Sequence, residues 1–171
     1  MTYSNFKSQL HEALQFGFID KDKFKETLNA PKVLINNQEE RQFVLTDIQE
    51  ELSNCIHFKF SVAFVTQSGI ALIKSQLSDL AAKNIKGEIL ISPYLDFNDP
   101  LALLELLKLE NVKVRVSPEQ IQLHSKFYLF DHNYKQVLIS GSSNLTGNAL
   151  KKNYEWNIKL TSTENLEKVG C

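Results

Sequence analysis

A histidine and a lysine two residues apart, His124 and Lys126, are suited to chemistry on a phosphate group. An imidazole nitrogen can attack phosphorus, and an ammonium group beside it can hold a non-bridging oxygen. A second polar segment, Gly141-Ser142-Ser143-Asn144, adds a hydroxyl, a side-chain amide and backbone N–H groups. Donors of this kind stabilise the charge that builds on the remaining oxygens in a transition state. The two segments together indicate a site that binds and attacks phosphate.

Strands must position these two segments. Residues 124–131 and 136–140 are predicted strands, and a polar turn at residues 132–135 joins them. His124 and Lys126 lie two apart on the first strand, so both side chains are expected on the same face of the sheet. The Gly-Ser-x-Asn segment follows the end of the second strand, beside the start of the first.

The whole chain predicts an α/β domain with a mixed β-sheet flanked by helices. The expected strands cover residues 33–35, 56–65, 88–91, 112–116, 124–131, 136–140 and 154–160. The expected helices cover residues 40–54, 69–84 and 100–108, and Asp99-Pro100 is a strong start for the last one. The strand–helix–strand order from residue 56 to residue 91 is a βαβ unit, so its two strands should be parallel. Phe58, Phe60 and Phe64 recur at period two and are expected in the core.

Both ends of the sequence contain predicted helices that are not part of the mixed sheet. Apolar residues at helical spacing predict two short helices within residues 1–30, and a proline ends this pattern. We expect a helical N-terminal extension over residues 1–30 and one domain over residues 31–171. Ser162 and Thr163 are typical caps of a helix that would begin just before the sequence stops. This predicts a fragment of a longer protein.

The composition excludes several classes of protein. Hydrophobic residues make up 43% of the chain and the formal net charge is −1, which is typical of a globular protein without an overall basic surface. The two cysteines, Cys55 and Cys171, form neither a disulfide framework nor a CxxC metal motif. The chain has no secretory leader pattern and no apolar segment of roughly 18 residues. We therefore expect a cytoplasmic protein that does not enter a membrane.

The order HxKxxxxD followed by GSxN resembles the motif of the phospholipase D superfamily, which includes lipases, lipid synthases and nucleases. The matching residues are His124, Lys126, Asp131, Gly141, Ser142 and Asn144. The spacer between Asp131 and Gly141 has nine residues, which is longer than usual for the family. These residues fall at a predicted hairpin tip, where extra residues are tolerated. The resemblance implies the phospholipase D/nuclease-type mixed sheet.

The resemblance also implies a mechanism that needs no metal and no other cofactor. In this family one histidine attacks phosphorus and forms a covalent phosphohistidine. The histidine of a second motif protonates the leaving group and then activates water. His124 would be one of these two histidines, and Lys126, Ser142 and Asn144 would hold the phosphate.

The resemblance implies roles for two further residues, Glu155 and Asp131. Glu155, Ser142 and Asn144 each also have an alternative interpretation. Glu155 stands where the family often has a glutamate that hydrogen-bonds the catalytic histidine; the alternative is a solvated charge on a strand. Asp131 is implied as a supporting residue rather than one that touches substrate. Ser142 and Asn144 are also favoured helix caps, which is compatible with phosphate binding at the start of a helix.

The family builds one active site from two motifs, and this sequence has one complete motif. The nearest second copy, His57-Phe58-Lys59, shares the spacing, but Phe64 stands where the aspartate is required and no Gly-Ser-x-Asn follows. We interpret it as a chance match. A second identical chain in a homodimer is the simpler source of the other half-site. A region outside this sequence is the alternative.

A looser resemblance over residues 61–69 and 92–100 is to phospholipase D-like domains at the N-terminus of superfamily II helicases and some restriction-type enzymes. It implies nucleic acid, in particular DNA, as the partner, and a covalently linked helicase domain in a longer protein. Lys151, Lys152 and Lys159 follow the motif closely and are expected near backbone phosphates.

Three functions remain in order of preference. The first is a metal-independent phosphodiesterase, most simply a nuclease. The second is a catalytically silent module for DNA binding or dimerisation in a helicase or restriction enzyme. The third is a lipid phosphodiesterase or phosphatidyltransferase, ranked last because the sequence offers no amphipathic helix rich in Lys and Arg for a membrane surface.

Overall fold

A computed structural model describes residues 8, 11, 30–93, 98–121 and 123–163 of the chain. The helices predicted within residues 1–30 therefore lie almost wholly outside the described residues, and so does the helix predicted after residue 163. Ser162 and Thr163, which the sequence predicts as caps of that helix, are instead the last residues of a strand. They form backbone pairs with the neighbouring strand, which explains their extended conformation.

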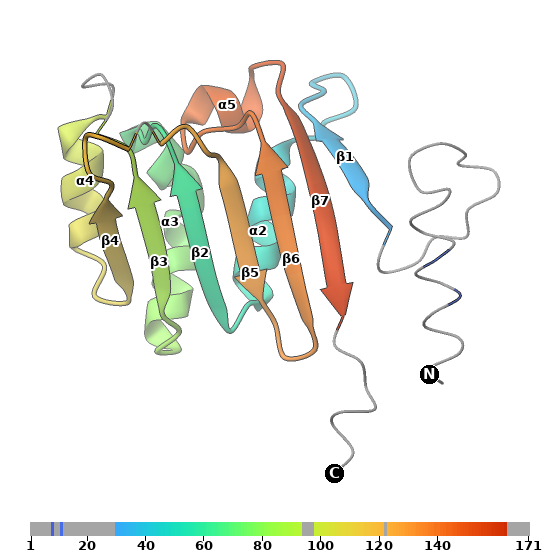
Figure 1. Cartoon of the computed structure of the whole chain (residues 1–171), viewed down its shortest axis with the longest axis horizontal. Coiled ribbons are helices and arrows are strands. Elements are labelled where there is room, and N and C mark those ends of the chain that lie inside the picture. Colours follow the sequence, from blue (N-terminus) through green and yellow to red (C-terminus); the bar gives the residue numbers. More distant parts are fainter. Residues whose placement is uncertain (1–7, 9–10, 12–29, 94–97, 122, 164–171) are drawn as a thin grey trace, which may run out of the picture.

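Within the described residues, seven strands form one mixed sheet in the order β1-β7-β6-β5-β2-β3-β4 (Figure 1). The strands are β1 (Lys32–Ile35), β2 (His57–Val62), β3 (Gly87–Ile91), β4 (Val112–Val116), β5 (Phe127–Asp131), β6 (Lys135–Gly141) and β7 (Trp156–Thr163). β2, β3 and β4 are parallel neighbours, whereas β5, β6, β7 and β1 are joined through antiparallel pairs. The predicted α/β class and mixed sheet are confirmed, as is the parallel pair of the βαβ unit.

The helices are α2 (Val44–Asn54), α3 (Gln67–Ala82), α4 (Pro100–Leu107) and α5 (Gly147–Lys151). Figure 1 shows α2 and α3 behind the sheet, α4 beside β4, and α5 above the top edge of the sheet. Asp99 caps α4 as predicted, because its side chain accepts a hydrogen bond from the Leu101 N–H at 3.0 Å. In the described part of the chain, no helix combines the length and apolar character that a membrane crossing requires.

The hydrophobic core fills the space between α2, α3 and one face of the sheet. Alternate residues of the central strands point into it, including Phe58 and Phe60 of β2 and Tyr128 and Phe130 of β5. The Phe60 ring meets the rings of Tyr128 and Phe130 edge-on, with centroid distances of 4.9 and 5.6 Å. Burial of each such side chain stabilises the fold by about 1.5–3 kcal/mol. Phe64 differs from the prediction, because it lies beyond the end of β2 and is only partly buried.

Strand direction brings three loop segments, from two connections, to the same end of the strands. β5 and β7 begin at this end and β6 finishes there, since each runs antiparallel to its neighbour. Residues 123–126 precede β5, residues 142–146 follow β6, and residues 152–155 precede β7. The polar segments of the sequence motif therefore meet where the strands end.

Candidate active site

His124 and Lys126 lie in an irregular segment just before β5, so the prediction that they belong to the strand itself was wrong. Regular pairing with β2 stops at Phe127, opposite Ser61. Beyond that point a side-chain contact, Ser61 Oγ to Ser125 Oγ at 2.6 Å, replaces backbone pairing. On the β6 side, the Lys126 carbonyl oxygen still accepts a hydrogen bond from the Gly141 N–H at 3.2 Å. One-sided pairing therefore leaves the motif residues at the rim of the sheet.

The two motif side chains contact each other at this rim. Lys126 Nζ donates to the His124 carbonyl oxygen at 2.9 Å and lies 3.0 and 3.2 Å from the two ring nitrogens. The His124 side chain is exposed, and its ring meets the Phe64 ring edge-on at a centroid distance of 6.4 Å. An accessible imidazole beside an ammonium group is an arrangement that suits attack on a phosphate.

Lys126 is more enclosed than its partner, with 8% of its surface exposed. Burial lowers the pKa of Lys126 below the ordinary value for a lysine, while the nearby Glu155 carboxylate acts in the opposite direction. A partly desolvated ammonium group interacts more strongly with an oxyanion than one in bulk water.

Ser142 and Glu155 form the second part of the site. The Ser142 backbone N–H donates to the Trp156 carbonyl oxygen, and the Trp156 N–H donates back to Ser142 Oγ, both at 3.0 Å. The Ser142 hydroxyl donates a short hydrogen bond to Glu155, whose other carboxylate oxygen accepts from Asn153 at 3.3 Å. Among the described contacts, Glu155 thus holds the serine and makes no hydrogen bond to His124.

Asn144 anchors the loop that follows β6. Its side-chain oxygen accepts from the Phe64 N–H at 3.0 Å, and the next residue, Leu145, pairs with backbone groups of Phe64 and Thr66 at 3.1 Å. Within the described residues, the Asn144 side-chain N–H₂ makes no hydrogen bond. That group remains able to donate to a bound phosphate oxygen.

A buried polar group beneath the loop was not predicted from the sequence. Asn157 donates to Ser143 Oγ at 2.9 Å and accepts from the Ser143 N–H at 3.3 Å, and the Tyr128 hydroxyl donates to the Ser143 carbonyl oxygen at 3.0 Å. Asn157, Ser143 and Tyr128 are each at most 1% exposed, so these hydrogen bonds are costly to break. The sequence signal that could have identified this group is Asn157, a polar residue at an inward-facing position of β7.

Gly141 allows β6 and β7 to approach each other next to the site. A Cβ atom at this position would lie 2.1 Å from the Trp156 carbonyl oxygen. The glycine of the motif is therefore required by close backbone packing.

Asp131, the aspartate of the motif, lies at the opposite end of β5. Its carboxylate is 3.3 Å from His57 Nδ1 and accepts from Gln136 at 2.8 Å. The structure therefore gives Asp131 structural contacts and does not bring it to His124. His57 and Lys59, the incomplete second motif, lie on β2 and not at the rim that carries His124.

The lysines that follow the motif divide into two groups. Lys159 was predicted near phosphates, and this was wrong: it is buried on the helix side of β7, with Nζ 2.8 Å from Asp47 and 2.9 Å from Glu51. Lys151 and Lys152, by contrast, are exposed at the end of α5. No group of three or more metal-binding side chains is found among the described residues.

The model of the family described as "Cardiolipin synthase, PLD-like domain" matches residues 49–170. Comparison with curated proteins gave no match.

Among solved structures, NucT from Helicobacter pylori has a TM-score of 0.59 and 23% identity, covering 81% of this chain and 87% of that one. Nuc from Salmonella typhimurium, a phospholipase D family member, has a TM-score of 0.58 and 18% identity, with coverages of 81% and 88%. Phosphatidylserine synthase from Haemophilus influenzae Rd KW20 has a TM-score of 0.55 and 12% identity, with coverages of 84% and 38%. At these identities the solved structures show a shared fold.

Proposed function

This chain belongs to the family of phospholipase D-like domains, and we propose that it is a metal-independent phosphodiesterase, a nuclease, that acts through His124. The observation that carries the proposal is the contact between the exposed His124 imidazole and the Lys126 ammonium at the rim of the sheet. Ser142 and Asn144 lie in the loop that follows the neighbouring strand, β6.

The proposed reaction has two steps. A neutral His124 nitrogen attacks phosphorus, the bond from phosphorus to the leaving oxygen breaks, and a second histidine protonates that oxygen. Water, deprotonated by the second histidine, then attacks the phosphohistidine and regenerates His124. An incoming phosphate replaces the imidazole as acceptor of the Lys126 N–H bonds, which frees the ring to react. The Asn144 N–H₂ group and the Ser142 hydroxyl would hold the remaining oxygens.

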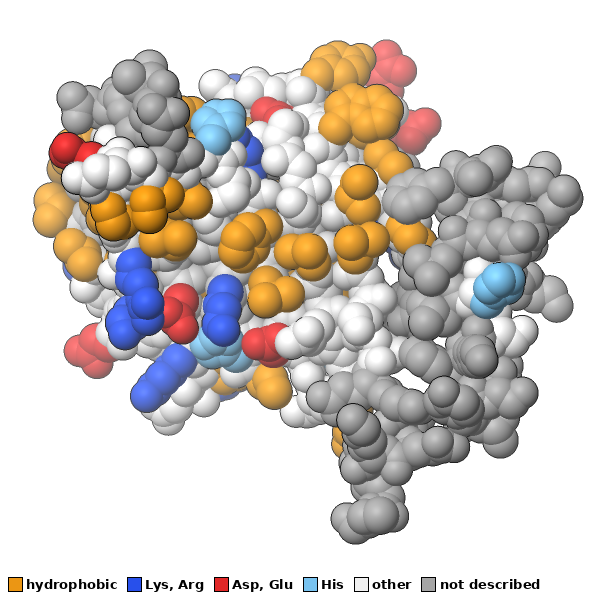
Figure 2. Space-filling view, viewed as in Figure 1, with side chains coloured by type: hydrophobic (Ala, Val, Ile, Leu, Met, Phe, Trp, Pro, Cys, Tyr) orange, Lys and Arg blue, Asp and Glu red, His pale blue; other side chains and the backbone are white. Residues whose placement is uncertain are grey.

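The second histidine would come from an identical chain, because the sequence has one complete motif. The sheet face away from α2 and α3 supports this dimer, since hydrophobic side chains form a row across it (Figure 2). Trp156, next to the site, is 69% exposed, and Val33, Ile35, Ile158 and Leu160 are exposed beside it. An apolar patch of this kind marks an interface. In this dimer the twofold axis would pass near Trp156, the patch residue that follows Glu155, so that the two catalytic rims face each other.

We propose nucleic acid as the preferred substrate. A helicase domain, linked to this chain in a longer protein, belongs to the same proposal. Lys151 and Lys152 are exposed, and among the described residues neither makes an ion pair, which favours a polyanionic chain as the ligand. A catalytically silent DNA-binding or dimerisation module is the second candidate. A lipid phosphodiesterase or phosphatidyltransferase is the third.

The test is to incubate the purified chain with labelled single- and double-stranded DNA in excess EDTA, beside the His124→Ala and His57→Ala variants. His57→Ala is the matched control, because it removes a histidine with the same x-Lys spacing away from the site. Cleavage by the wild type and by His57→Ala, but not by His124→Ala, supports the proposal. Salt-sensitive DNA binding without cleavage favours the silent module. Head-group release from phospholipid vesicles with DNA left intact favours the lipid enzyme.

A further inference from the structure

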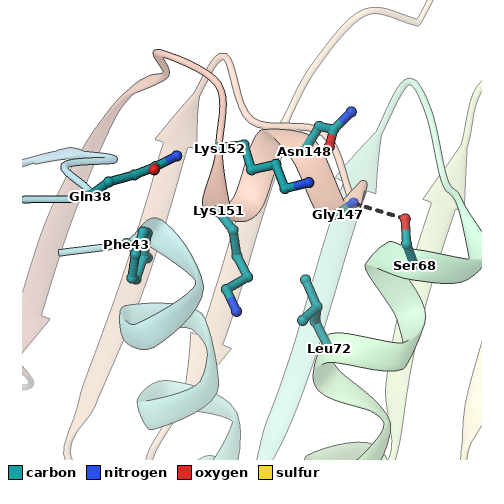
Figure 3. A pocket seen from close by; sticks show the side chains of 8 residues that line it. All are labelled: Gln38, Phe43, Ser68, Leu72, Gly147, Asn148, Lys151 and Lys152. Atoms are coloured by element: carbon teal, nitrogen blue, oxygen red, sulfur yellow. Dashed lines mark hydrogen bonds between the residues drawn. The ribbon is translucent and has the colours of Figure 1, made fainter. Parts of the chain in front are cut away.

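A pocket of about 470 Å³ opens between the first turns of α2 and α3 and the short helix α5 (Figure 3). It is separate from His124 and Lys126, and none of its lining residues belongs to the proposed catalytic set. The chain nevertheless connects the two regions closely. The loop with Ser142 and Asn144 leads directly into α5, and Glu155 follows shortly after α5.

The rim of this pocket is cationic. Lys151 and Lys152 both line it, and within the described residues neither amine makes an ion pair or a hydrogen bond. Lys151 Nζ lies 5.9 Å from the centroid of the Phe43 ring. Among the described residues, no acidic side chain lines the pocket. The two positive charges are therefore available to an anionic ligand.

The rest of the lining is mixed. Phe43 and Leu72, both partly buried, provide an apolar surface, while Gln38, Ser68 and Asn148 add polar groups. Figure 3 shows Lys151 extending past Phe43 and Lys152 extending towards Asn148. The volume lies within the roughly 300–1,000 Å³ of ligand clefts in proteins. An anionic group attached to a flat, weakly polar body fits this combination, and a nucleotide has that chemistry.

We propose that this pocket is a second subsite, which holds one nucleotide of the nucleic-acid substrate beside the scissile phosphate. Its phosphate contacts Lys151 and Lys152, and its base lies against Phe43 and Leu72. This inference rests on the proposed function, because a strand bound at the catalytic rim must cross α5 to reach the pocket. The subsite provides affinity for a chain of nucleotides that a small phosphodiester lacks.

The test uses the full chain with Lys151→Ala/Lys152→Ala and, as matched control, Lys83→Ala/Lys86→Ala, two exposed lysines near the other end of α3. A single-stranded oligonucleotide is compared with bis(4-nitrophenyl) phosphate, a small diester that reaches only the catalytic rim. For the pocket variant, the ratio of kcat/KM for the oligonucleotide to that for the small diester should fall about tenfold. The slope of log binding constant against log salt concentration should fall by about 1.4, roughly 0.7 for each lysine. The control should match the wild type in both measurements.

The outcomes separate this inference from the proposed function. If the wild type cleaves both substrates and the pocket variant keeps the wild-type ratio and salt slope, the subsite is refuted and the nuclease stands. If the wild type cleaves neither substrate, the proposed function fails. Fluorescence anisotropy with the oligonucleotide then decides the subsite: weaker binding by the pocket variant alone supports it, and equal binding by all three proteins refutes it.

Discussion

Replacing Lys159 by methionine should destabilise the fold strongly, because this lysine neutralises two carboxylates behind the sheet. Its Nζ lies 2.8 Å from Asp47 and 2.9 Å from Glu51. The side-chain exposures are 11% for Lys159, 25% for Asp47 and 5% for Glu51. Removing one partner of a buried ion pair costs about 3–5 kcal/mol, and the partial exposure of Asp47 favours the lower end, about 3 kcal/mol. For a chain of this length, that corresponds to a melting temperature lower by about 6–12 °C.

The pH dependence adds a second measurement. Burial by itself would raise the pKa of Glu51, but the hydrogen bond from Lys159 and the nearby positive charges hold it below its ordinary value. A carboxylate with a lowered pKa stabilises the fold above its unfolded pKa of 4.5, and this contribution is lost as the pH falls through the lower, folded pKa. In Lys159→Met the main group that lowers this pKa is absent. The acid-induced loss of stability from Glu51 should therefore become smaller, with Lys135 and His132 as the remaining positive neighbours that lower this pKa.

Urea unfolding at pH 7 and below pH 4.5 measures both effects. Lys113→Met, at an exposed position of strand β4, is the matched control and should change stability little. Adding Glu51→Met to Lys159→Met should recover part of the loss, because it removes a buried carboxylate that has lost its Lys159 partner and keeps only His132 at 2.7 Å and Lys135 at 3.5 Å. A loss no larger than that of Lys113→Met would refute the reasoning, since it would mean that water screens the network.

Three further predictions concern the site and the thiol. Glu155→Gln removes the charge that raises the pKa of Lys126, so the alkaline limb of a kcat/KM profile should move to lower pH; an unmoved limb would exclude this coupling. Gly141→Ala forces a Cβ against the Trp156 carbonyl and should cost about 2 kcal/mol in thermal unfolding as well as activity; a wild-type melting temperature would contradict it. Burial raises the pKa of Cys55 to about 11, so in a chain lacking its other cysteine this thiol should react with Ellman's reagent at pH 8 only after unfolding. Rapid reaction of the folded chain would show that the thiol is accessible.

The order of strands and helices was predictable because burial sets a period along each element. Alternation at Val112–Val116 and the strand–helix–strand pattern before it give β4 and the parallel β2–β3 pair correctly. The ends of strands were less predictable. β5 begins at Phe127 because β2 stops providing backbone partners there, and that partner is distant in sequence.

Prediction of the candidate site has the same limit, because contacts with residues distant in sequence could not be predicted. The motif identifies His124, Lys126, Ser142 and Asn144 by residue type, and the fold places all four near one edge of the sheet. The burial of Lys159 was not predictable, because a lysine on a strand next to a motif has the same local pattern whether it faces solvent or a carboxylate on a helix. The contacts that matter for Lys159 are Asp47 and Glu51, more than a hundred residues earlier.

Every proposed catalytic side chain lies in a loop segment that directly precedes or follows a strand of the antiparallel run β5–β6–β7, and this has a consequence for folding kinetics. These strands follow one another along the chain and pair with sequence neighbours, whereas β1 pairs with β7 across most of the chain length, Lys32 opposite Lys159. Closing short loops takes less conformational entropy than closing long ones. The catalytic rim should therefore form early, with the β1 edge added late, so destabilising β1 should accelerate unfolding with little effect on the folding rate.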